Sequence, residues 1–220
     1  LGRSNQFVNS LLEDKKRRCI WIGTEGSLYK YDPLRKKAEV MEGFHDNSVK
    51  SLALDGNGQL LVGTDNGLYV YREGEELQHI VHDSRNIQSL ANNIIWTIFP
   101  DKENNIWLGT DYGISMSRHN SVLHYIPISQ ITGTGEGNQL YCLLRDSKGF
   151  YWFGGTNGLI RFTNPSGGRQ EVVWYKMGDK QYPLSHNRVR CIYEDREHQL
   201  WIATDGSISR YDYKTERFVH

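Results

Sequence analysis

Four side chains that suit ligand binding occupy one equivalent position in four copies of an internal repeat: Lys50, Trp96, Tyr141 and Arg190. Aromatic rings of this kind stack on sugar faces, and the two cations can donate hydrogen bonds to hydroxyl or carboxylate groups. The remaining copy, which is the first along the chain, carries Asn9 at this position. We expect these residues to form a collar at one mouth of the fold. The alternative is that they fill gaps between repeats, with the cations reaching outward to solvent.

Further candidates flank this collar in the repeat. Each copy also has a turn that contains Gly, and the residues at the tip of this turn differ between copies; they include Asp111, Tyr112 and Asn157. Asp and Asn are common in turns for structural reasons, whereas an aromatic residue such as Tyr112 at an exposed tip needs another explanation. His186 and Arg188 lie just before the fifth copy and can join the same rim.

The sequence shows no persuasive catalytic or metal-binding set. The collar contains no carboxylate and no His, which favours binding over acid–base catalysis. Three Cys fit neither a disulfide framework nor a zinc site, and no cofactor is expected. The chain has 26 basic and 26 acidic residues, so electrostatics give no reason to expect nucleic-acid contact.

The repeat that positions these residues returns five times. Its clearest strings are WIGTEGSL, LVGTDNGL, WLGTDYGI, WFGGTNGL and WIATDGSI, which begin at residues 21, 61, 107, 152 and 201. Successive copies are therefore separated by 40 to 49 residues. This period is typical of the four-stranded blades of a β-propeller.

Each copy reads as strand, Asp turn, strand, Gly turn, strand, followed by a weaker fourth strand. The Asp should cap turn amides. A glycine should lie where strands crowd in four copies, at Gly23, Gly63, Gly109 and Gly154. Another glycine should supply a positive φ in the tight turn, at Gly67, Gly113 and Gly158, with Gly26 and Gly206 serving one place earlier in their copies. The Trp that opens four of the strings should lie between adjacent blades. Truncating one to Ala should cost about 3–5 kcal/mol.

The sequence therefore predicts an all-β β-propeller made of four-stranded antiparallel blades. We expect five blades, approximately at residues 8–44, 45–90, 91–136, 137–184 and 185–220.

These copies resemble the two-component-regulator propeller repeat, whose pattern is roughly V-x-x-I-x-E-D-x-x-G-x-L-W-I-G-T-x-x-G-L-x-R-F. The segments EDREHQLWIATDGSISRY and RDSKGFYWFGGTNGLIRF are similar to this pattern. Two residues depart from it: Pro100, in the third copy, stands where Glu is usual, and Ala203, in the fifth copy, stands where Gly is usual. The resemblance implies a periplasmic sensor region of a Bacteroides-type hybrid two-component histidine kinase, which detects oligosaccharides during glycan use. No kinase segment is recognisable in this chain.

The resemblance also implies a seven-bladed ring, so five repeats suggest an arc of a larger propeller. We expect such an arc to self-associate through its uncovered blades, and to contact an adjoining propeller or a following domain. The absence of an initiator Met and of a signal-like start suggests an excised segment. Two alternatives remain open: a propeller enzyme such as a lyase or glycosidase, and a protein-interaction scaffold.

Overall fold

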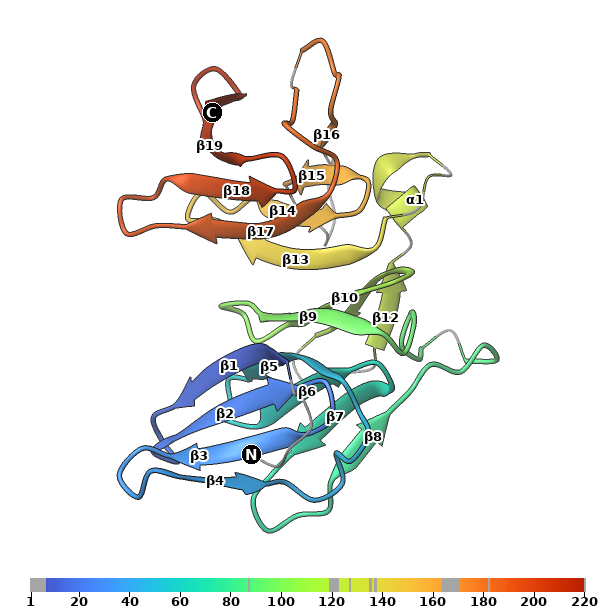
Figure 1. Ribbon diagram of the computed structural model, residues 1–220. Coiled ribbons are helices and arrows are strands. Elements are labelled where there is room, and N and C mark those ends of the chain that lie inside the picture. Colours follow the sequence, from blue (N-terminus) through green and yellow to red (C-terminus); the bar gives the residue numbers. More distant parts are fainter. Residues whose placement is uncertain are drawn as a thin grey trace. The chain divides into compact units, whose positions relative to one another are not determined.

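The fold is all-β, as the repeats predict. The computed structural model describes residues 7–86, 88–118, 123–126, 128–134, 136, 138–163, 171–181 and 183–219. Within these ranges the strands form five four-stranded antiparallel sheets, or blades, each built from four strands consecutive in sequence (Figure 1). One short helix, α1 (Ile128–Thr132), is also present in the described part.

The chain divides into two compact units. One contains residues 1–108 and 115–125, and the other contains residues 109–114 and 126–220. Blade 1 is β1 (Val8–Asp14), β2 (Cys19–Thr24), β3 (Leu28–Asp32) and β4 (Lys37–Val40), and blade 2 is β5 (Val49–Leu54), β6 (Leu60–Thr64), β7 (Gly67–Tyr71) and β8 (Gln78–Ile80). Blade 3 is β9 (Ile95–Pro100), β10 (Ile106–Thr110), β11 (Gly113–Ser117) and β12 (Leu123–Ile126).

The second unit holds the last two blades, α1 and residues 109–114, which form the Gly turn of blade 3. Blade 4 is β13 (Leu140–Arg145), β14 (Tyr151–Gly155), β15 (Gly158–Phe162) and β16 (Val172–Tyr175), and blade 5 is β17 (Val189–Glu194), β18 (Leu200–Thr204), β19 (Ile208–Asp212) and β20 (Arg217–Val219).

The Asp turn and the Trp form one structural device. Asp146 Oδ1 accepts the backbone N–H groups of Lys148 and Phe150, the Asx turn predicted from sequence. Its other oxygen, Oδ2, accepts the indole N–H of Trp152 at 2.7 Å, which the sequence did not reveal. Equivalent Asp–Trp bonds join residues 14 and 21, 101 and 107, and 195 and 201. The carboxylate thus fixes the turn and also satisfies the polar atom of a large apolar side chain.

Blades pack through an aliphatic residue that fills the space above a glycine. A Cβ on Gly23 would lie 2.5 Å from Val49 Cγ1, and one on Gly154 would lie 2.5 Å from Val189 Cγ1. Val49 and Val189 are each fully buried against the preceding blade. The expectation that this glycine removes a side chain where strands crowd is confirmed.

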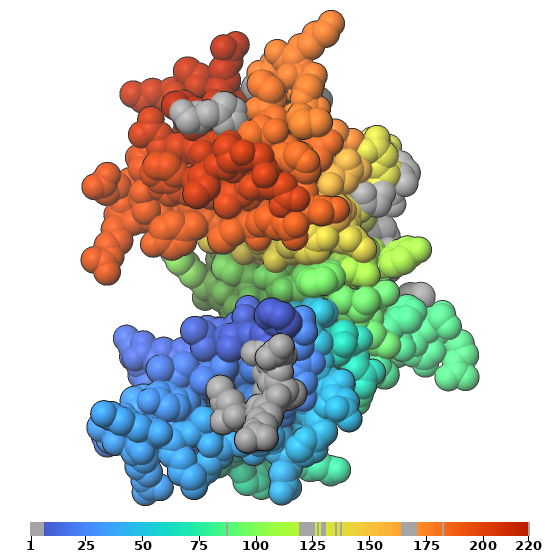
Figure 2. All heavy atoms as spheres, in the orientation of Figure 1, coloured from blue at the N-terminus to red at the C-terminus, as the bar shows by residue number. Residues whose placement is uncertain are grey.

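Trp21 and Trp152 lie between blades, as predicted, because residues of blades 2 and 5 respectively pack over them. The same prediction for Trp201 is wrong. Its side chain is 38% exposed, because no described blade packs over the outer face of blade 5. Figure 2 shows the orange and red atoms of this blade at the surface of its unit.

The Gly turns are of two kinds. Gly67, Gly113 and Gly158 have φ of 100°, 124° and 99°, as predicted. Gly26 and Gly206 do not have positive φ, so the expected shift of the flexible residue by one place is wrong. A threonine side chain stabilises turns of both kinds: Thr24 Oγ1 accepts the N–H groups of Gly26 and Ser27, and Thr64 Oγ1 accepts that of Asn66.

Candidate functional site

The variable position of the repeat coincides with a β-bulge. In blade 1, Val8 pairs with Thr24 and Ser10 pairs with Gly23, so Asn9 is an extra residue without a partner on β2. The same shift in register leaves out Lys50 in blade 2, Tyr141 in blade 4 and Arg190 in blade 5. A bulged residue is released from the ladder, and bulges commonly redirect a side chain next to a functional site. The backbone thus singles out the position that sequence comparison had singled out by chemistry.

In the first unit, the collar side chains of neighbouring blades contact one another. Lys50 Nζ lies 4.5 Å from the centroid of the Trp96 ring, a cation–π contact between blades 2 and 3. Lys50 Nζ also donates to Ser48 Oγ at 3.4 Å. Asn9 donates from its amide to the carbonyl oxygen of Val49 at 3.2 Å, which links blade 1 to blade 2. Lys50 and Trp96 are both partly exposed, so solvent reaches the pair.

In the second unit, the collar is an aromatic–cation pair held by a carboxylate. The guanidinium carbon of Arg190 lies 5.6 Å from the centroid of the Tyr141 ring. Arg190 Nε donates to Asp205 Oδ1 at 2.6 Å, and Arg188 Nη1 lies 3.6 Å from Asp205 Oδ2. His186 Nδ1 accepts the backbone N–H of Arg188 at 3.0 Å. The structure therefore brings Tyr141, His186, Arg188 and Arg190 together around Asp205.

Electrostatics keep this cluster charged. The hydrogen bond from Arg190, reinforced by the nearby Arg188, holds the pKa of Asp205 below its ordinary value, although slight burial opposes this. The same hydrogen bond raises the pKa of Arg190. Asp205 is therefore ionised at neutral pH and suited to orienting cations, not to giving up a proton.

The remaining candidates lie on Gly turns of the second unit. Asn157 belongs to a separate polar group. Its side-chain amide donates to Glu136 Oε2 at 2.9 Å, and its backbone carbonyl oxygen accepts the indole N–H of Trp174 at 2.8 Å. Tyr112 is 73% exposed, and its backbone N–H donates to Thr110 Oγ1. Asp111 precedes it in the same turn and is partly buried.

Sequence comparison missed Asp205 and Glu136 as partners of the candidate residues. Asp205 was visible as one variable turn tip among several, but its pairing depends on how the Gly turn folds back over the bulge. Glu136 lies 21 residues before Asn157, between two blades, where no repeat pattern marks it.

Among the described residues, no group of three or more His, Cys, Asp and Glu side chains is placed to hold a metal ion. No helix in the described ranges is long and apolar enough to cross a membrane.

Comparison with known families and structures gives the repeats their identity. The sequence pattern described as "two component regulator propeller" matches residues 2–26, 89–112 and 183–206. Each match spans the first strand, the Asp turn and the Trp-containing strand of one blade. No curated protein sequence matches significantly.

Among solved structures, the chain is 71% identical to the extracellular domain of BT4673 from B. thetaiotaomicron, which is described as part of a one-component system in one structure and of a hybrid two-component system in another. That match covers 99% of this chain and 30% of the other, with TM-scores of 0.51 and 0.52. The chain thus spans less than a third of that relative.

Other matches show the fold alone. The extracellular domain of the hybrid two-component system BT3049 from B. thetaiotaomicron is 22% identical, with a TM-score of 0.76 over 98% of this chain and 30% of its own. Virginiamycin B lyase from Staphylococcus aureus is 14% identical, with a TM-score of 0.73 over 97% of this chain and 69% of its own. Five blades with this pattern, together with the match to the BT4673 domain, identify the chain as a β-propeller segment of the two-component-regulator propeller repeat family.

Proposed function

We propose that this chain is part of the extracytoplasmic sensor region of a hybrid two-component system, which binds an oligosaccharide in the periplasm. The proposal is supported by the regulator-propeller repeats and by 71% identity to an extracellular domain of such a system. In it, ligand binding is passed to a histidine kinase across the inner membrane, so that the parent protein regulates glycan use. The segment itself binds and does not catalyse.

The observation that carries the ligand site is the bulge. It places unlike side chains at one equivalent point of successive blades, where neither strand pairing nor core packing requires them. Trp96 and Tyr141 present aromatic faces, and Lys50 and Arg190 present donors beside them. A sugar ring can stack on an aromatic face while its hydroxyls accept from the cation.

Asp205 gives the Arg190 donor a fixed direction. A long cationic side chain loses rotamer entropy when a ligand orders it, and the ion pair at 2.6 Å meets part of that cost in advance. The guanidinium has five N–H donors, so those that do not bind the carboxylate can face a ligand.

The same proposal includes contact partners for the sensor. An adjoining propeller or a following domain of the parent protein would contact the ligand-bound form and respond to it. Asp111, Tyr112 and Asn157, which lie on turns at the same end of their blades as the bulges, would contribute to that surface.

A propeller lyase or glycosidase is the second candidate. The only support for it is the fold of the lyase, at 14% identity. An enzyme of either class needs positioned acid and base groups, whereas the carboxylate of this cluster is neutralised by two arginines. A protein-interaction scaffold would use the same surface without any sugar.

Calorimetry against a library of oligosaccharides, with product analysis of each mixture, separates these functions. Sensing predicts saturable binding of one oligosaccharide without turnover. Turnover of that sugar would instead establish the enzyme, and binding of a protein domain without any sugar would establish the scaffold.

Two variants test whether residues at the variable position form the site. Trp96→Ala and Arg190→Ala should each weaken sugar binding about tenfold, a loss of about 1.4 kcal/mol. Both should leave the melting temperature near that of the parent chain. Arg210→Ala is the control for Arg190, because Arg210 is also exposed on blade 5. A large drop in melting temperature for either site variant would mean that the collar is part of the core.

A further inference from the structure

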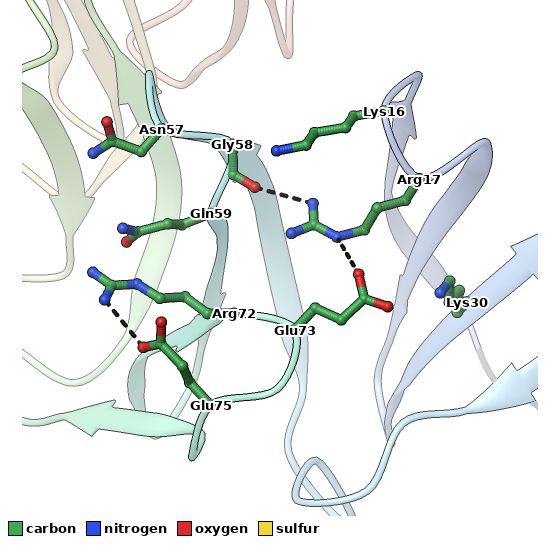
Figure 3. Close-up of a pocket in the computed structure, with 9 residues that line it drawn as sticks. All are labelled: Lys16, Arg17, Lys30, Asn57, Gly58, Gln59, Arg72, Glu73 and Glu75. Carbon is green, nitrogen blue, oxygen red and sulfur yellow. Dashed lines mark hydrogen bonds and ion pairs between the residues drawn. The ribbon is translucent and has the colours of Figure 1, made fainter.

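A polar cavity of about 520 Å³ lies at the other end of blades 1 and 2, among the turns opposite the bulges. Figure 3 shows its walls: the β1–β2 turn supplies Lys16 and Arg17, the β5–β6 turn supplies Gly58 and Gln59, and the turn after β7 supplies Arg72. The lining residues are Lys16, Arg17, Lys30, Asn57, Gly58, Gln59, Arg72, Glu73 and Glu75. A volume of this size accommodates a small-molecule ligand.

Cations outnumber carboxylates in this cavity, four to two. Arg17 is largely buried and fixed: its Nη1 donates to Asp14 Oδ2 at 2.7 Å and to the carbonyl oxygen of Gly58 at 3.0 Å. Its buried Nε makes no hydrogen bond, and a carboxylate oxygen of Glu73 lies 3.8 Å from it. The Nε of Arg72 is likewise buried without an acceptor.

Buried Asp14 pairs with Arg17, whereas the two glutamates of the cavity neutralise the remaining positive charge only loosely. The side chains of Glu73 and Glu75 are 72% and 54% exposed, so water screens their ion pairs. Figure 3 shows the carboxylate of Glu73 directed toward the guanidinium of Arg17 and that of Glu75 toward Arg72. An incoming anion can displace them without leaving a buried charge unpaired.

Blade 1 departs from the repeat at this cavity. Its Asp and Trp, residues 14 and 21, are seven apart, whereas Asp101–Trp107, Asp146–Trp152 and Asp195–Trp201 are six apart. The lengthened turn reads DKKRR. Its residue with positive φ is Arg18, at 53°, where the turns of the other blades have Gly58, Asn104, Gly149 and His198. The turn is one residue longer than those of the other blades, and all four residues between Asp14 and Cys19 are basic.

We propose that this cavity binds an oxyanion group — a carboxylate, sulfate or phosphate — of a small polar ligand. Planar guanidinium groups match the geometry of an oxyanion, and the Lys16 ammonium and the Gln59 amide add further donors. The site is distinct from the collar, because it lies at the opposite ends of the strands, and it does not depend on the proposed sugar sensing.

Titration calorimetry on the whole chain at low ionic strength tests the proposal. Sodium sulfate, glucuronate and glucose 6-phosphate are the probes, and glucose is the uncharged control. We expect saturable binding of at least one anion and none of glucose. The strongest binder identifies which oxyanion the site prefers. No saturable binding of any of the three anions at millimolar concentration would overturn the proposal.

Charge-changing variants locate the binding. Arg72→Gln and Lys16→Gln should each weaken it about fivefold or more, and Glu73→Gln should strengthen it, because a competing carboxylate is removed. Arg85→Gln is the matched control: Arg85 is exposed in the same unit and pairs with Asp83, away from the cavity.

Equal weakening by Arg85→Gln would reveal non-specific attraction to the chain and overturn the site. Melting temperatures of all variants distinguish loss of binding from loss of fold. If Arg72→Gln unfolds the unit, the opposite signs expected for Lys16→Gln and Glu73→Gln still decide the question.

Discussion

At the scale of single residues, the same side chain has different consequences in different blades. Trp152 is fully buried and its indole N–H bonds to Asp146, whereas Trp201 makes the equivalent bond to Asp195 but is partly exposed. Both belong to the second unit, so they can be compared directly. Burial, not residue type, decides what each contributes to stability.

Trp152→Ala should therefore reduce the free energy of unfolding by about 3–5 kcal/mol. Trp201→Ala should reduce it by clearly less, because less apolar surface is removed from a packed interior. Urea denaturation followed by circular dichroism measures both. Equal losses would show that the outer face of blade 5 is covered in solution.

The Asp–Trp bond can be tested through protonation. The indole N–H of Trp201, together with turn amides, holds the pKa of Asp195 below its ordinary value. A lowered pKa in the folded state means that this carboxylate stabilises the fold above its unfolded pKa. That stability is lost as pH falls through the folded pKa.

Trp201→Phe removes the donor and keeps a ring. It should raise the pKa of Asp195 toward the ordinary value, as measured by NMR titration of the carboxyl carbon. It should also shift the loss of stability on acidification to higher pH. An unchanged pKa would mean that the turn amides alone lower it.

At the scale of strands and turns, the glycine of the second strand and the first residue of the next blade act together. Val49, Ile95 and Val189 all pack over such a glycine and are fully buried. Ala203 occupies the equivalent place in blade 5, where no described residue of a following blade packs over it.

Gly154→Ala should destabilise the second unit by about 1–3 kcal/mol, because the added methyl overlaps Val189 and the sulfur of Cys142. Ala203→Gly, at the equivalent position, relieves no overlap and should cost at most about 1 kcal/mol through the flexibility of glycine. Thermal melting of the pair compares them. A neutral Gly154→Ala would mean that blades 4 and 5 can move apart by a few tenths of an ångström.

At the scale of the whole molecule, blades 1 and 5 each have one uncovered apolar face. Val8 is 52% exposed, although its equivalents Val49 and Val189 are fully buried. Ile208 is 66% exposed, although its equivalent Leu28 is fully buried. Leu11 on blade 1 and Tyr193 on blade 5 add to these surfaces. Apolar patches of this kind favour association.

We propose that copies of this 220-residue chain self-associate through these faces. Light scattering should give a mass above the 25.5 kDa of one chain, and the mass should fall with dilution. Leu11→Asp and Ile208→Asp should each shift the distribution toward the monomer. A monodisperse monomer at high concentration would contradict the proposal.

The sequence by itself determined the repeat, the all-β fold, the Asp turns, the positive-φ glycines of three blades and the one variable position. These features are set within a strand or a turn, so a single repeat encodes them and five copies make them visible. Tertiary structure decided which tryptophans are buried, that the variable residues are bulged, that Asp205 holds Arg190, and that the DKKRR turn closes a cavity with blade 2. Each of these depends on atoms of another strand, turn or blade, and those contacts follow no local pattern in the chain.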